Sequence, residues 1–330
     1  MKILVTGGTG FTGTHLVRRL LGEGHEVVAL DIQDGLFRPE LEGKGARVLI
    51  GDAAEPAVLE RAVDGCEIVF HLAAAFRKIN VPGSVYRRVN VDGTRLLLEA
   101  CRRAGVRRFV YCSTQGVHGD VKEIPGDEDS PIRPNDVYQQ TKWEGERLVG
   151  EAVDKGMPCV VLRPMGIYGP GDPGRMLLLF KFADSGRFFM FGDGETLYHP
   201  VYIDNFIDAF LLAMEKDEAV GRTYLVGDAE YVTLNHLVRE SGRALGRDVR
   251  IIHLPFGPLR AAAAVVEGVC MPLRISPPLF RRRIEWYRQN RAFRVDRIRN
   301  ELGFEPKVDL PAGLRITADW YRRAGYLALR

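Results

Sequence analysis

Two side chains with complementary acid–base chemistry stand one helical turn apart in the stretch Val137-Tyr138-Gln139-Gln140-Thr141-Lys142. Residues four apart in a helix lie on the same face, so the phenol of Tyr138 and the ammonium of Lys142 would point the same way. A phenol with its ordinary pKa of about 10 is a weak base at neutral pH, but a nearby cation favours the phenolate and lowers that pKa. The pair could therefore move a proton to and from a hydroxyl group.

The beginning of the chain carries the pattern of a dinucleotide-binding loop. The apolar run Lys2–Thr6 predicts a buried strand, a helical pattern covers His15–Leu21, and Gly7, Gly10 and Gly13 lie between them. Glycines at this position allow a tight turn and let backbone amides approach a pyrophosphate at the N-terminus of the helix. The segment therefore predicts a site for a dinucleotide.

An acidic residue after the next predicted strand indicates which dinucleotide. Asp31 follows the strand Glu26–Leu30, about where a carboxylate binds both ribose hydroxyls of NAD. A carboxylate repels the 2′-phosphate of NADP, which would need a cation close by. Gly8 and Ile32 offer none, and Arg38 lies several residues away. We therefore expect NAD as the cofactor.

Strands and helices continue to alternate through the first half of the chain. Further strands are predicted at Arg47–Ile50, Glu67–His71, Arg108–Cys112 and Cys159–Arg163, with helices at Glu55–Val63 and Val91–Ala104 between them. Helical connections of this length imply right-handed crossovers and a parallel sheet. In such a sheet the ligand site lies at the carboxyl ends of the strands.

The motifs, in chain order, are Thr6–Gly13, Asp31, Gly51-Asp52, His71–Ala74, Asn90–Thr94, Ser113-Thr114, Tyr138 with Lys142, and Leu162–Pro170. Together they resemble the extended short-chain dehydrogenases/reductases, the group that includes NAD-dependent sugar epimerases and dehydratases. The resemblance covers nearly the whole chain. It implies an α/β fold, a Rossmann-type doubly wound parallel sheet with a smaller, discontinuous C-terminal substrate domain.

The resemblance also implies how the chain divides. Residues 1–165 would form the NAD-binding Rossmann domain, and residues 201–228 would return to it. Residues 166–200 and 229–330 would form the substrate-binding domain. Within the second domain, Thr233 precedes the helical pattern Leu234–Leu245 and is predicted as its N-cap.

By the same resemblance, Tyr138 is the acid/base, Lys142 both tunes it and binds the nicotinamide ribose, and Thr114 orients the reacting oxygen. Ser113 is a possible substitute for Thr114. The predicted cofactor-binding residues are Gly7, Gly10, Phe11, Thr12, Gly13, Asp31, Asp52, Ala53, Leu72, Ala73, Ala74, Asn90, Ser113, Tyr138, Lys142, Pro164, Gly166 and Ile167. The predicted substrate-binding residues are Phe76, Thr114, His118, Arg175 and His199, and no metal site is expected.

The function that follows is an NAD-dependent oxidoreductase that transfers a hydride to or from a secondary alcohol or ketone carbon. Two alternatives stay open: a nucleotide-sugar (UDP-sugar) epimerase acting through a transient ketone, and an NAD-binding regulatory protein without catalysis. Sugar-nucleotide enzymes usually carry Asn where this chain has Gly166, and Arg within the stretch that reads Leu197–Pro200 here. Tyr202–Asn205 is similar to the 3β-hydroxysteroid dehydrogenase branch. A small hydroxyl or keto compound is expected, nucleotide-sugar or steroid-like.

Composition excludes several other classes. The net charge of +3 is too small to predict nucleic acid as a partner, and five scattered cysteines show no metal-binding or disulfide spacing. We therefore expect a cytoplasmic protein, with no signal peptide before the first strand. The apolar run Leu259–Leu273 is too short and too interrupted by charge to span a membrane. The resemblance implies a homodimer formed through the helices Val91–Ala104 and Val137–Val153.

Overall fold

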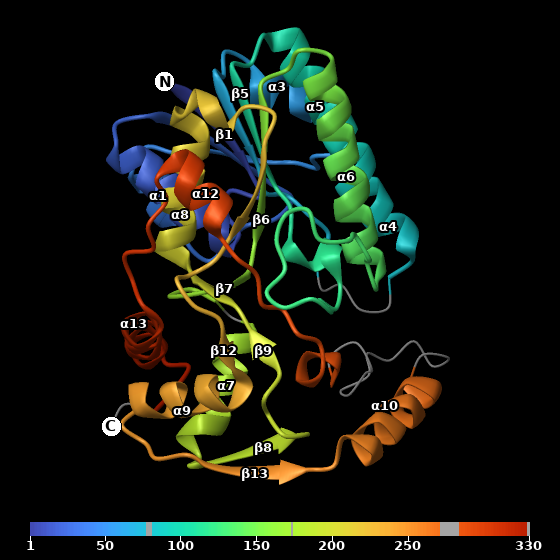
Figure 1. Cartoon of the computed structure of the whole chain (residues 1–330). Coiled ribbons are helices and arrows are strands. Elements are labelled where there is room, and N and C mark those ends of the chain that lie inside the picture. The colour runs from blue at the N-terminus through green and yellow to red at the C-terminus, as the bar shows by residue number, and fades with distance from the viewer. Residues whose placement is uncertain (77–80, 173, 271–283, 329–330) are drawn as a thin grey trace.

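The computed structural model describes residues 1–76, 81–172, 174–270 and 284–328 (Figure 1). Two lobes are visible, an upper one built on a large sheet and a lower one built on short strands and helices. The apolar run predicted at Leu259–Leu273 forms part of a helix up to Cys270, and its last three residues lie outside the described part. Within the described residues, no helix combines the length and apolar character needed to cross a bilayer.

The upper lobe contains a seven-stranded, entirely parallel sheet with the order β11-β6-β5-β4-β1-β2-β3. Its strands are β1 (Lys2–Thr6), β2 (Glu26–Asp31), β3 (Arg47–Ile50), β4 (Ile68–His71), β5 (Arg108–Cys112), β6 (Cys159–Pro164) and β11 (Thr223–Val226). Every strand predicted from the sequence is present, with ends that shift by one residue at most. The predicted Rossmann-type fold is confirmed.

Helices cover both faces of this sheet, which explains why its strands are apolar runs without alternation. On one face lie α1 (Phe11–Gly22) and α8 (Ile203–Glu215), and on the other α3 (Pro56–Val63), α5 (Gly93–Ala104) and α6 (Val137–Asp154) (Figure 1). Residues that alternate along β1 enter different cores. Ile3 and Val5 pack with Leu16 of α1, whereas Leu4 packs with Leu97 of α5.

The predicted helix from Val91 begins earlier than expected. A short helix, α4 (Gly83–Arg87), runs through a π-helical turn, η1 (Arg88–Asp92), directly into α5. The remaining elements of the upper lobe are α2 (Arg38–Gly43), the 3-10 turns η2 (Gln115–His118) and η3 (Asp217–Ala219), and α12 (Asp296–Leu302). Although α12 comes from the C-terminal part of the chain, it lies beside the sheet near α8 (Figure 1).

The lower lobe is built from three two-stranded sheets and the helices around them. The pairs are β7 (Gly166–Tyr168) with β10 (Pro200–Tyr202), β9 (Leu197–Tyr198) with β12 (Val232–Thr233), and β8 (Arg187–Phe191) with β13 (Arg250–Leu254). Its helices are α7 (Arg175–Asp184), α9 (Leu234–Ala244), α10 (Phe256–Cys270), α13 (Leu310–Arg323) and the short turn η4 (Glu285–Tyr287). The chain therefore crosses between the lobes several times.

The predicted cap of α9 is confirmed, because the side chain of Thr233 accepts a hydrogen bond from the backbone N–H of His236 at 3.1 Å. Replacing Thr233 with Ala removes this acceptor and should lower the free energy of unfolding by about 1 kcal/mol. Thr233→Ser keeps a hydroxyl at the same place and serves as the matched control. Urea denaturation followed by circular dichroism measures both, and equal losses in the two variants would contradict the capping role.

Candidate active site

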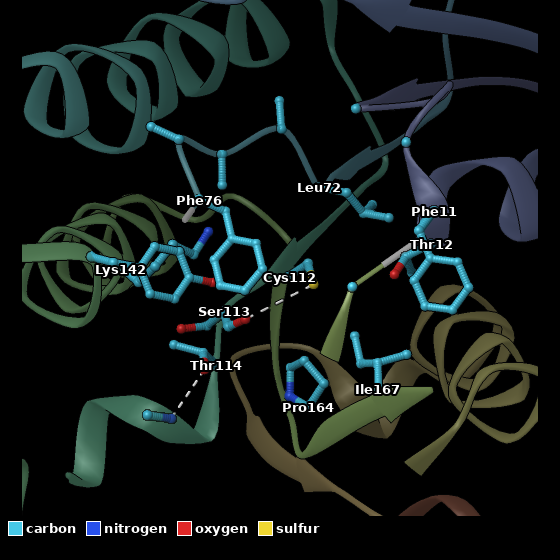
Figure 2. Close-up of a pocket in the computed structure, with 18 of the residues that line it drawn as sticks. Phe11, Thr12, Leu72, Phe76, Cys112, Ser113, Thr114, Lys142, Pro164 and Ile167 are labelled. Atoms are coloured by element: carbon cyan, nitrogen blue, oxygen red, sulfur yellow. Dashed lines mark hydrogen bonds between the residues drawn. The ribbon is translucent and has the colours of Figure 1, made fainter. Parts of the chain in front are cut away.

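A cleft of about 860 Å³ lies where the carboxyl ends of the main strands face the lower lobe. Figure 2 shows that its walls come from separate elements, with Phe11 and Thr12 of α1, Ser113 and Thr114 after β5, and Lys142 of α6. The predicted residues that line it are Gly7, Gly10, Phe11, Thr12, Gly13, Asp31, Asp52, Ala53, Leu72, Ala73, Ala74, Phe76, Ser113, Thr114, Tyr138, Lys142, Pro164, Gly166 and Ile167.

The glycine loop after β1 closes back on the start of α1. Gly7 has a φ of 70°, which favours glycine, and its N–H donates to the carbonyl of Leu30 at 2.8 Å. A Cβ atom on Gly13 would lie 2.0 Å from the carbonyl oxygen of Gly7. Side chains are therefore excluded where the loop meets the helix, and the backbone stays open to a pyrophosphate at the positive end of α1.

The carboxylate of Asp31 stands beside this loop. Asp31 accepts hydrogen bonds from the backbone N–H groups of Thr9, at 3.1 Å, and Ile32, at 2.8 Å, which fix it at the end of β2. Arg38, the nearest cation considered for a 2′-phosphate, is engaged by Asp34 and Glu42. A fixed carboxylate, with the guanidinium of Arg38 already ion-paired, fits the ribose of NAD better than that of NADP.

Tyr138 and Lys142 lie in the first turns of α6, which the side chain of Asp136 caps by accepting from the N–H of Gln139 at 2.9 Å. Lys142 is only 1% exposed, and its Nζ lies 4.0 Å from the centre of the Tyr111 ring. Burial lowers the pKa of Lys142 to about 8, so the ammonium still holds its proton at neutral pH. The site therefore keeps a cation one turn from the Tyr138 phenol.

The hydroxyls after β5 differ in their hydrogen bonds. Thr114 caps the turn η2, its Oγ1 accepting from the N–H of Gly116 at 3.0 Å (Figure 2). Ser113 is buried and its Oγ donates to the carboxylate of Glu146. Both residues line the cleft, at the foot of the wall that carries Lys142 and Phe76. The ring of Phe76 lies 4.9 Å, centre to centre, from that of Tyr138.

Three predicted site residues lie behind the cleft wall instead of lining it. Asn90 is buried in the π-helical turn, where it accepts from the N–H of Ala75 at 2.7 Å and donates to Thr141 at 2.9 Å. It therefore ties the cleft wall to the second turn of α6. His118 and His199 are buried among backbone and side-chain partners, 2% exposed each. Arg175 begins α7, and its side chain lies outside the described part of the structure.

Sequence reasoning did not assign the lower-lobe residues of the cleft, Tyr198, Trp286, Gln289 and Arg291. Arg291 is held beside β9, where its backbone N–H donates to the backbone carbonyl of Leu197 at 3.0 Å. A Cβ atom on Gly166 would lie 1.8 Å from the Tyr198 hydroxyl, so the tyrosine fills the space that a side chain at position 166 would need. No sequence motif predicts these residues. The glycine at position 166, where sugar-nucleotide enzymes usually carry Asn, was the one indication that this part of the cleft differs.

A glycine loop at a helix N-terminus, a carboxylate at the end of β2 and a Tyr–Lys pair in one cleft define a dinucleotide-dependent oxidoreductase. The chain belongs to the NAD dependent epimerase/dehydratase family, whose model matches residues 3–227. It is therefore an enzyme, with NAD as its cofactor. The predicted family, fold class, cofactor and general function are confirmed.

Relatives with several different activities are similar to this chain over most of its length. It is 33% identical to the 2-alkyl-3-oxoalkanoate reductase of Stenotrophomonas maltophilia, covering 96% of this chain and 98% of the relative. It is 34% identical to a 3 beta-hydroxysteroid dehydrogenase/Delta 5-->4-isomerase of Mycobacterium tuberculosis, covering 92% of this chain and 86% of the relative. The crystal structure of UDP-glucose 4-epimerase from Thermotoga maritima matches with a TM-score of 0.79 at 27% identity, covering 98% and 99%.

The contact between Gly13 and Gly7 gives a direct test of the dinucleotide site. Gly13→Ala forces the loop away from α1 and should weaken NAD binding by at least about tenfold, a loss of about 1.4 kcal/mol. Gly22, in the same helix, has no neighbour within 4 Å of an added Cβ, so Gly22→Ala is the matched control. Isothermal titration calorimetry measures both. Unchanged NAD affinity in Gly13→Ala would exclude this loop as the pyrophosphate site.

Proposed function

We propose that the enzyme interconverts a secondary alcohol and a ketone, with Tyr138 as the acid/base. The observation that carries this proposal is the buried Lys142 cation one turn from the Tyr138 phenol, in the same cleft as the glycine loop. The loop residues Gly7–Gly13 and Asp31 would hold NAD, which when bound accepts or supplies the hydride. The other predicted cofactor-binding residues that line the cleft would complete its site.

The side chains of the cleft divide the proton chemistry between them. In the oxidation, Tyr138 takes the hydroxyl proton of the substrate as the hydride leaves its carbon. In the reduction, the phenol returns that proton to the oxygen. The ammonium of Lys142 stabilises the phenolate, because opposite charges in a site with little water attract strongly. Thr114 would hydrogen-bond the reacting oxygen and orient it. General acid–base catalysis of this kind contributes about 10²–10⁴ in rate.

The aromatic walls of the cleft favour an apolar substrate skeleton. Phe76 lies against Tyr138, and Tyr198 and Trp286 pack together on the lower-lobe side with their ring centres 6.1 Å apart. The similarity to an oxoalkanoate reductase and to a hydroxysteroid dehydrogenase supports the same class. We therefore propose a small ketone or alcohol on a hydrocarbon framework, with Phe76 in contact with it.

A second candidate is a UDP-sugar epimerase, in which the ketone intermediate rotates in the site so that the hydride returns to its opposite face. Arg291 in the cleft wall favours this candidate, since a guanidinium is suited to a diphosphate. The similarity to the Thermotoga maritima epimerase also supports it. The absence of a side chain at Gly166 speaks against it, because Tyr198 occupies the place of the usual Asn.

Replacing the acid/base separates these candidates from a binding protein without catalysis. Tyr138→Phe keeps the ring and removes the hydroxyl, so turnover should fall by at least about 100-fold while NAD still binds. The assay panel contains 2-alkyl-3-oxoalkanoates, 3β-hydroxysteroids and UDP-sugars, with NADH or NAD followed at 340 nm and sugar products by chromatography. Tyr326→Phe, in a ring packed against Trp320, is the matched control.

Each outcome of this panel has a distinct meaning. Turnover of an oxoalkanoate or hydroxysteroid that Tyr138→Phe abolishes supports the first candidate, and turnover of a UDP-sugar supports the second. NAD binding without turnover of any compound, equal in both proteins, would favour the regulatory alternative.

We also propose a division of labour between 1–165 with 201–228, which would hold NAD, and 166–200 with 229–330, which would hold the substrate. The pairing of β11 with β6 supports the return of the chain to the first domain. The position of α12 on the sheet makes the boundary near residue 300 less simple than this division.

All five cysteines are free thiols, which supports the proposal of a cytoplasmic location.

A homodimer built through α5 and α6 is the further proposal, by similarity to the family. Light scattering after gel filtration should then give about twice the monomer mass of 36.9 kDa. A single species at the monomer mass over a hundredfold range of concentration would rule it out.

A further inference from the structure

Behind the candidate active site lies a buried ion pair with no part in the proton transfer proposed above. Glu146 follows Lys142 by one helical turn on α6, and Arg163 faces it from β6. Arg163 donates to the Glu146 carboxylate from Nε at 3.1 Å and from Nη2 at 2.6 Å. The two side chains are 6% and 4% exposed. Charges buried this deeply persist only when each is paired and hydrogen-bonded.

The remaining hydrogen bonds of Arg163 determine which ring nitrogen of His118 carries the proton. Its Nη1 lies 3.0 Å from Nε2 of His118 and donates to the carbonyl of Glu128 at 3.2 Å. Because a guanidinium can only donate, His118 must accept at Nε2 and carry its proton on Nδ1, which donates to the carbonyl of Ser130 at 2.9 Å. Burial and the Arg163 charge lower the pKa of His118 to about 4, so the His118 imidazole stays neutral near pH 7.

The pair reaches the cleft through Ser113. The Ser113 hydroxyl donates its single proton to Glu146, so this hydroxyl has no proton to offer a substrate oxygen. The Thr114 hydroxyl differs, because its Oγ1 accepts a hydrogen bond from the N–H of Gly116. Its own proton can therefore turn toward the cleft and be donated to a substrate oxygen. Two adjacent hydroxyls thus receive different roles from the groups behind them.

Glu146 also acts on Lys142. The described groups that face Lys142 are Tyr138 and Glu146 on α6, Tyr111 and Cys112 on β5, and His71 on β4. Burial raises the pKa of the Cys112 thiol to about 11 and, with the Lys142 charge, lowers that of His71 to about 3, so both are neutral near pH 7. Burial also raises the pKa of Tyr111. Cys112 and then Glu146 raise the pKa of Lys142 against burial, and because the Cys112 thiol is neutral near pH 7, the Glu146 carboxylate is the negative charge that supports the ammonium.

We propose that Glu146, held by Arg163, is a positioning residue that commits the Ser113 proton away from the substrate and sustains the positive charge of Lys142. The proposal rests on the proposed function, since it gives Thr114 the donor role and Lys142 the cationic role. It adds that neither role is fixed by the Ser-Thr and Tyr–Lys motifs alone. Which hydroxyl donates, and the positive charge of Lys142, then depend on the Glu146–Arg163 ion pair behind the cleft wall.

Carbon-13 NMR of ε-labelled lysines tests the charge effect without cofactor or substrate. The Lys142 signal is identified by its loss in Lys142→Met, and its titration is followed in wild type, Glu146→Gln and Glu144→Gln. Glu144 is the matched control, because it lies on the same helix and pairs with Arg87 on the surface side. The titration should shift to lower pH in Glu146→Gln alone. An identical titration in all three proteins would overturn the proposal.

The hydroxyl roles are tested by variants that leave the ion pair in place, so they remain informative if Glu146→Gln does not fold. Thr114→Val should lower kcat by about 100-fold or more through loss of the donor. Ser113→Ala should lower it by less than about tenfold, with the pH profile of kcat unchanged. Equal losses in the two variants would contradict the assignment. Activity that survives Tyr138→Phe would instead refute the proposed function and leave the Lys142 titration as an independent result.

Discussion

The positive charge of Lys142 is held where almost no water reaches it, and much of the site is arranged around that fact. Burial lowers the pKa of Lys142, because a charged amine in a medium of low polarity is costly. The Tyr111 ring beneath the ammonium and the Glu146 carboxylate one turn away oppose this shift. The result is a cation at neutral pH whose field is weakly screened, beside a phenol that a bulk-solvated lysine would influence far less.

That arrangement requires α6 to stand at a fixed height against the sheet. The Asp136 cap sets where the helix begins, and Asn90 links Thr141 to the backbone of Ala75. Asn90 can do so because the π-helical turn before α5 directs its side chain into the interior. A π turn adds a residue to a helix and often occurs at functional sites. The strands then bring their carboxyl ends to the same edge, so the loop after β1, the hydroxyls after β5 and α6 meet in one cleft.

The lower lobe contributes side chains to one wall of this cleft. Short strands bring Leu197 and Arg291 together, although nearly a hundred residues separate them, and the Tyr198 ring packs against Gly166. Tyr198 and Trp286 give this wall an aromatic surface, and Arg291 adds a cation to it. The relatives are named for activities on oxoalkanoates, hydroxysteroids and UDP-glucose, so similar chains of this family serve different substrates.

The sequence by itself determined the sheet, the cofactor and the Tyr138–Lys142 pair, because these depend on local patterns: apolar runs, glycines at a turn, an acid at a strand end and a helical spacing. The tertiary structure alone placed Asn90, His118 and His199 behind the wall and brought Tyr198 and Arg291 into it. It also joined Ser113 to Glu146 and Arg163, which lie on three different elements. Contacts between distant segments carry no local signature, since burial and hydrogen-bond partners are set only when the elements pack.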